Sequence, residues 1–95
     1  MNNKYETIFV LSTKSFDEPA LEAATEKFKA LIAEHGAVES VDVWGKRRLA
    51  YPINYETEGY YVLINFEAPP EFPKELQRIY NITSGVLRSI VVRRN

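Results

Sequence analysis

Cysteine is absent from this 95-residue chain, and histidine occurs only once, at His35. The first absence excludes disulfides, thiolate chemistry and zinc sites with sulfur ligands, and the second excludes a metal site built on paired histidines. His35 precedes Gly36 at the predicted end of a helix, where a histidine favours the helix dipole. No motif pairs it with a nucleophile. We therefore expect neither an enzyme nor a bound metal or cofactor.

Long apolar runs and an excess of one charge are also missing. No stretch approaches the ~20 apolar residues that a membrane-spanning helix requires. The first residues also lack the pattern of a secretory signal, so a cytoplasmic protein is expected. Lysine and arginine number 12 against 13 aspartates and glutamates, which gives a formal net charge of −1. The length suits a single domain over residues 1–95.

The hydrophobic periodicity predicts six elements. Strands are expected over residues 5–11, 38–53, 60–66 and 86–92, with a polar turn over 54–59, a helix from Asp17-Glu18-Pro19 to Gly36, and a second helix bearing Phe72, Leu76, Ile79 and Tyr80. The order βαββαβ with two right-handed crossovers predicts an α+β, ferredoxin-like fold. Its four-stranded antiparallel sheet would have the order fourth, first, third, second, with both helices on one face. Pro52 then lies on an edge strand, where its missing N–H is tolerated.

The sheet face without helices is expected to be apolar. If Thr7, Phe9 and Leu11 face the helices, their neighbours along the first strand face outward. A contiguous apolar patch is typical of a partner site, whereas scattered surface hydrophobics would need no explanation. The residues predicted to bind a partner here are Ile8, Val10, Tyr61, Leu63 and Ile90, together with Val41 and Val43 on the edge strand.

A local basic patch occupies the long second strand. Lys46, Arg47 and Arg48 lie between Trp44 and Tyr51, and such a combination suits phosphate contacts and stacking on unpaired bases. The alternatives are a solvated strand edge, or ion pairs of the arginines with Asp42, Glu39 or a partner carboxylate. The predicted RNA-binding residues are Lys46, Arg47, Arg48, Arg88, Arg93, Arg94 and Tyr5.

Trp44 and Tyr51 are seven positions apart, and Gly45 predicts a bulge between them. We expect one of the two to face a partner and the other to face the core, with two core aromatics as the alternative reading. Both residues are counted among the predicted partner contacts.

Three other functional classes share this predicted topology. An RNA-recognition motif would need a cation and a second stacking aromatic along the third strand, where Glu58 and Val62 stand instead. An acylphosphatase-like enzyme would need an arginine in a phosphate-binding loop, and residues 12–16 contain none. A homodimeric regulatory or ligand-binding module, pairing its open sheet face with a second copy, remains as the alternative function.

The run Gly45-Lys46-Arg47-Arg48-Leu49-Ala50-Tyr51-Pro52-Ile53 resembles the family of the sixth protein of the bacterial small ribosomal subunit. The Tyr5-Glu6-Thr7 start, Gly59-Tyr60-Tyr61 and the ending Val86–Val92 resemble it in the same order. The resemblance implies a ferredoxin-like structural protein. It also implies pairing with the eighteenth protein of that subunit and binding to the central domain of its RNA. A basic partner at a shared RNA site is consistent with the near-neutral charge of the chain, because phosphate neutralisation supplies much of the affinity of RNA-binding proteins.

Overall fold

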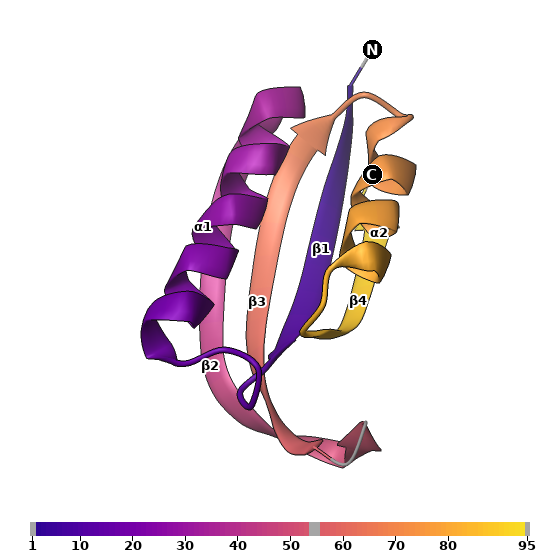
Figure 1. The fold of residues 1–95 in the computed structure, drawn as a ribbon. Coiled ribbons are helices and arrows are strands. Elements are labelled where there is room, and N and C mark those ends of the chain that lie inside the picture. Colours follow the sequence, from indigo (N-terminus) through magenta and orange to yellow (C-terminus); the bar gives the residue numbers. More distant parts are fainter. Residues whose placement is uncertain (1, 54–55, 95) are drawn as a thin grey trace.

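The structure, a computed structural model, describes residues 2–53 and 56–94. Its elements are β1 (Asn3–Ser12), α1 (Glu18–His35), β2 (Ala37–Ile53), β3 (Glu56–Ala68), α2 (Phe72–Ile82) and β4 (Val86–Arg93). The strands form one antiparallel sheet in the order β2-β3-β1-β4, and both helices pack on the same face (Figure 1). The predicted ferredoxin-like fold and strand order are confirmed.

Helix α1 begins and ends where the local chemistry requires it. Asp17 accepts a hydrogen bond from the Ala20 N–H at 3.0 Å, which satisfies one of the orphan donors of the first turn. Gly36 ends the helix, and a Cβ built on it would lie 2.0 Å from the Glu67 carbonyl oxygen. Glycine is needed there because the chain passes so close to β3. The predicted helix bounds are confirmed to within one residue.

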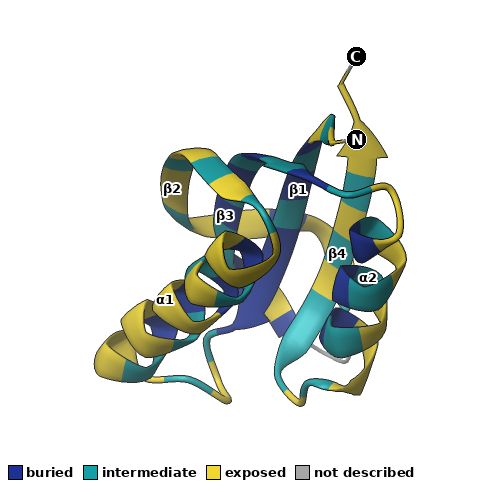
Figure 2. Cartoon of the chain, turned by 90° about the horizontal axis from the view of Figure 1, so that it is seen from above, coloured by how far each residue is buried: buried dark blue, intermediate teal, exposed yellow. Residues whose placement is uncertain are grey.

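The core lies between the sheet and the two helices. Phe9 from β1, Phe28 from α1 and Tyr80 from α2 meet with ring centroids 5.0–5.4 Å apart. Thr7 donates a hydrogen bond to the Ile90 carbonyl at 2.9 Å, so the Tyr80 hydroxyl is the donor in its 3.1 Å contact with Thr7. Figure 2 shows the buried residues concentrated on β1, β3 and the inner sides of the helices. No described helix is long and apolar enough to cross a membrane.

The β2–β3 hairpin is longer than predicted and bends at its far end (Figure 1). Strand β3 starts at Glu56, inside the predicted polar turn, while the remaining turn positions 54 and 55 lie outside the described residues. Gly45 has φ +80° at a register shift next to Val43, which confirms the predicted bulge. Such bulges bend a strand and increase its twist. The bend brings β2 residues Leu49 and Tyr51 beside Arg88 of β4, the opposite edge of the sheet.

Candidate functional site on the open sheet face

Apolar side chains line up across the sheet face that the helices leave uncovered. Leu63 of β3 pairs with Ile8 of β1, and Ile8 pairs with Ile90 of β4, so the three side chains share one face. Ile8 and Leu63 are half-buried, whereas Ile90 is exposed. Val92 is also exposed. We call these four residues, together with Trp44 and Tyr61, the open-face patch. The expected outward position of Ile8, Leu63 and Ile90 is what the structure shows.

Val10 is a correction to the predicted exposed surface. It pairs with Tyr61 and Arg88 on the open face, yet only 2% of its surface is exposed. The bent hairpin explains this burial, since Leu49 is also buried and lies over the same point. A Cβ built on Gly59 would lie 2.3 Å from Val10 Cγ1 and 3.4 Å from Leu49 Cδ2. Val10 therefore packs in a small second core and offers a partner almost no exposed surface, although it lines a hollow on this face.

Trp44 and Tyr51 both lie outside the core. The Trp44 ring stacks on Tyr61, with centroids 6.1 Å apart and planes 14° apart, and its Nε1 donates to Asp42 at 3.0 Å. Exposed fractions of 38% for Trp44 and 64% for Tyr51 contradict the expectation that one of them is a core residue. The bulge at Gly45 places Trp44 beside Tyr61, and the bend carries Tyr51 around toward Arg88.

Val41 and Val43 face the helices and not the open side. Val41 pairs with the buried Ile64 and packs against the helix-side core. Val43 pairs with the buried Val62 and lines a groove beside α1, where it remains exposed. The prediction missed this because it did not assign a face to the edge strand before the bulge. Neither residue adds to the open-face patch.

A shallow hollow of about 180 Å³ opens within the patch. Ile8, Trp44, Tyr61 and Ile90 line it, with Arg88 at its side. Tyr61 and Arg88 also line a second hollow of about 60 Å³ beneath the bent end of β2. The guanidinium-bearing Arg88 thus lies next to the aromatic residues Trp44 and Tyr61 on the open face. Such a site suits a planar or aliphatic group from a partner.

The three consecutive cations of β2, Lys46, Arg47 and Arg48, each have different neighbours. Lys46 pairs with Tyr60 in the ladder and forms a 2.8 Å salt bridge with Glu18 at the start of α1. The hydrogen bond to Glu18 raises the pKa of Lys46. Arg47 donates from Nε to the Trp44 carbonyl at 3.3 Å, and Arg48 lies opposite Glu58 in the ladder. Neither arginine pairs with Asp42 or Glu39, the carboxylates considered from the sequence.

The C-terminal cations lie at the other end of the sheet. Arg94 forms an ion pair with Glu39 of β2 and donates to the Tyr5 carbonyl at 3.1 Å, while Lys4 lies 3.6 Å from the same Glu39 carboxylate. The hydrogen bond from Arg94 holds the pKa of Glu39 below its usual value. Arg93 pairs with Tyr5 in the β1–β4 ladder. Arg94, one of the two C-terminal arginines predicted to bind RNA, is therefore already paired with a carboxylate of the same chain.

Tyr5 is a further correction among the predicted site residues. Its side chain is buried and stacks on Phe66 with centroids 5.6 Å apart, so the ring is not available to a nucleobase. Conversely, Val92 was not predicted, although the alternation from Ile90 places it on the same face two residues later. Among the residues that the structure describes, no three histidine, aspartate or glutamate side chains gather as a metal site.

The comparisons with known proteins agree with this architecture. The family model described as "Ribosomal protein S6" matches residues 4–93. The chain is 60% identical over 89 residues to the small ribosomal subunit protein bS6 of Clostridium novyi, covering 93% of each chain. It is 57% identical over 90 residues to the protein of that name from Clostridium beijerinckii, covering 94% of each.

A solved structure gives the same result at the level of the fold. The crystal structure of 30S ribosomal protein S6 from Thermotoga maritima superposes with a TM-score of 0.91 at 29% identity, covering 99% of this chain and 89% of that one. The family match over nearly all of the sequence, the close relatives and the shared fold show that this chain belongs to the ribosomal protein S6 family.

Proposed function

We propose that this protein binds the central domain of small-subunit ribosomal RNA jointly with a basic partner, the eighteenth protein of the same subunit. Family membership supports a place in the small ribosomal subunit. The role is structural, and it requires no catalytic group, metal or cofactor. The partner docks on the open-face patch, and both chains then present cations to one RNA surface.

The observation that supports this proposal best is the exposed apolar face on a chain without excess positive charge. Ile90, Val92 and Trp44 expose large apolar surfaces on one side of the sheet. Contiguous apolar surface of this kind marks a protein interface more often than an RNA site. With a net charge of −1, the chain lacks the electrostatic excess that would let it bind RNA tightly alone. A basic partner supplies that charge.

The arginines around the patch support a shared RNA site. Arg88 lies beside the Trp44–Tyr61 stack, and Arg47 is held against the Trp44 backbone. A partner seated over Ile8, Leu63 and Ile90 would therefore have these cations at its margin. Phosphate contacts from both chains then add, while the apolar contacts set their relative position.

A matched pair of substitutions tests the docking surface. Ile90 on the open face is 43% exposed, and Ile82 on α2 is 68% exposed. Ile90→Glu should fold and weaken partner binding by about tenfold or more, because a carboxylate would be desolvated against an apolar partner surface. Ile82→Glu makes the same chemical change on the helix side and should leave binding unchanged. The measurement is isothermal titration of the partner; equal affinities for both variants would reject the open face as the interface.

A further inference from the structure

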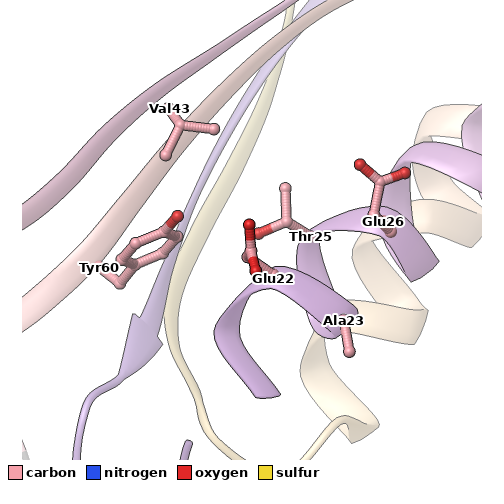
Figure 3. A pocket seen from close by; sticks show the side chains of 6 residues that line it. All are labelled: Glu22, Ala23, Thr25, Glu26, Val43 and Tyr60. Carbon is pink, nitrogen blue, oxygen red and sulfur yellow. The ribbon is translucent and has the colours of Figure 1, made fainter. Parts of the chain in front are cut away.

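A second surface, a groove on the helix side of the molecule, has no part in the proposed assembly. The groove has a volume of about 610 Å³ and separates α1 from the strands β2 and β3. Figure 3 shows Tyr60 and Val43 pointing from the sheet toward the helix, with Glu22 and Thr25 facing them from α1. Glu26 lies one turn further along the helix. The sheet separates this groove from the open-face patch.

Carboxylates dominate the electrostatics of the groove. Glu22 and Glu26 are four residues apart on α1, where like charges repel each other. Both are exposed, and neither belongs to an ion pair within the described part of the chain. Glu18 lies at one end and is joined to Lys46. The pKa of Tyr60 is raised by burial and, secondarily, by the negative charges of Glu22 and Glu18. The groove therefore attracts cations and repels nucleic-acid phosphates.

The sheet side of the groove is formed by the side chains of Tyr60 and Val43, so an occupant must also present apolar surface. The Tyr60 ring is half-buried, and Val43 is 47% exposed although it lies beside the core. An occupant must therefore combine a cationic head with an aliphatic stem. Arginine meets both conditions better than lysine, because its planar guanidinium stacks on an aromatic ring and forms paired hydrogen bonds to carboxylates. Along α1 the groove covers about one helical turn, from Glu22 to Glu26, so two carboxylates are available to it.

We propose that this groove binds an arginine-bearing segment of a basic polypeptide. One arginine stem lies over Tyr60 and Val43, and its guanidinium is directed at Glu22, with Glu26 available to the next cation along the segment. Because the groove lies across the sheet from the open-face patch, a protein bound there and a partner on the patch do not compete. The interaction is electrostatic and weakens as salt is raised.

The test uses capped peptides with alternating glycine and arginine, and the same peptides with citrulline, the neutral isostere of arginine. Binding is followed by NMR chemical shifts of the Tyr60 ring and the Thr25 and Val43 amides. The arginine peptide should shift these signals. The Glu22→Gln/Glu26→Gln variant should bind it about fivefold more weakly, since two exposed charge pairs are removed. Glu34→Gln, at an exposed carboxylate near the other end of α1, should bind as the unaltered protein does.

Four results would count against the proposal. One is equal binding of the citrulline peptide, because charge would then be irrelevant. Another is a shift pattern centred on Trp44 and Ile90, which would place the peptide on the open face. The third is spermidine competing as well as the arginine peptide at equal charge, since the groove would then be a site for any polycation. Retained affinity in the double glutamine variant would contradict the assignment of Glu22 and Glu26.

Discussion

At the scale of single residues, Gly59, Val10 and Leu49 pack together on the open face and leave no room for a side chain at position 59. Val10 Cγ1 occupies the space where a Cβ of residue 59 would stand, at 2.3 Å. Leu49 closes the contact from the bent end of β2. We expect this small cluster to hold the bent end of β2 against the sheet, and the position of Tyr51 to depend on it.

Substitution of Gly59 by alanine tests that dependence. Gly59→Ala should lower the free energy of unfolding by about 1–3 kcal/mol, because the branched Val10 side chain has little freedom to move aside. Val10→Ala creates space at the same point, so the double variant should lose less than the sum of the two single changes. Urea denaturation of the four proteins measures the coupling. Strictly additive losses would show that the contact does not constrain the hairpin.

Tyr80 gives a pH-dependent prediction. Burial raises the pKa of its hydroxyl above the usual value near 10. Above pH ~10 the hydroxyl ionises in the unfolded chain but stays protonated in the folded one, so its contribution to stability is complete below that pH and is lost above it. The expected slope is about 1.4 kcal/mol per pH unit.

Tyr80→Phe removes this ionisation together with one buried hydrogen bond. At pH 7 to 9 the variant should be less stable than the unaltered protein by about 1 kcal/mol. Between pH 10 and 11 that difference should shrink, because only the unaltered protein loses the Tyr80 contribution. Denaturation midpoints at several pH values provide the measurement, and the other tyrosines and the lysines affect both proteins alike. A difference that stays constant through pH 11 would contradict the raised pKa.

At the scale of elements, the bulge at Gly45 divides β2 into two parts with different surroundings. Before the bulge, Val41 and Val43 face the helices. After it, the strand bears three consecutive cations and bends over the open face. Lys46 is joined to Glu18 of α1, so the run does not act as one uniform basic patch.

We therefore expect unequal contributions to RNA binding along this strand. Replacement of Arg47 and Arg48 by glutamine should lower the salt slope of RNA binding in the assembled complex by about one unit for each phosphate that is no longer neutralised. Lys46→Gln should have a smaller effect, because its ammonium group already has a carboxylate partner. The measurement is the RNA dissociation constant over a series of salt concentrations. A larger effect of Lys46→Gln than of the arginine changes would reverse the assignment.

At the scale of the whole molecule, the sequence predicted the topology well because its signals are local and repetitive. The cap at Asp17, the stop at Gly36 and the alternation in β1 each act within a few residues, and all of them agree with the structure. The faces of β1 and β3 also followed from alternation. What could not be predicted was anything that depends on the bend of the hairpin, namely the burial of Val10 and the exposure of Tyr51.

The candidate site was predictable only in part, for a physical reason. Residue type indicates what a side chain is able to bind, whereas its availability depends on contacts distant in the sequence. Tyr5 was expected at an RNA surface but stacks on Phe66, 61 positions away in the chain, and Arg94 reaches Glu39 across the sheet. No local pattern encodes either contact. The roles proposed for the remaining cations and for the open-face patch stay predictions.

The most direct test of the central claim is the coupling between partner and RNA. Titrate a central-domain fragment of small-subunit RNA into this protein alone and into its saturated complex with the eighteenth protein. Then titrate that partner with and without RNA. We predict weak RNA binding by the isolated chain, an increase of about tenfold or more with the partner, and an equal factor in the reverse titration. RNA affinity that is the same with and without saturating partner would contradict joint binding.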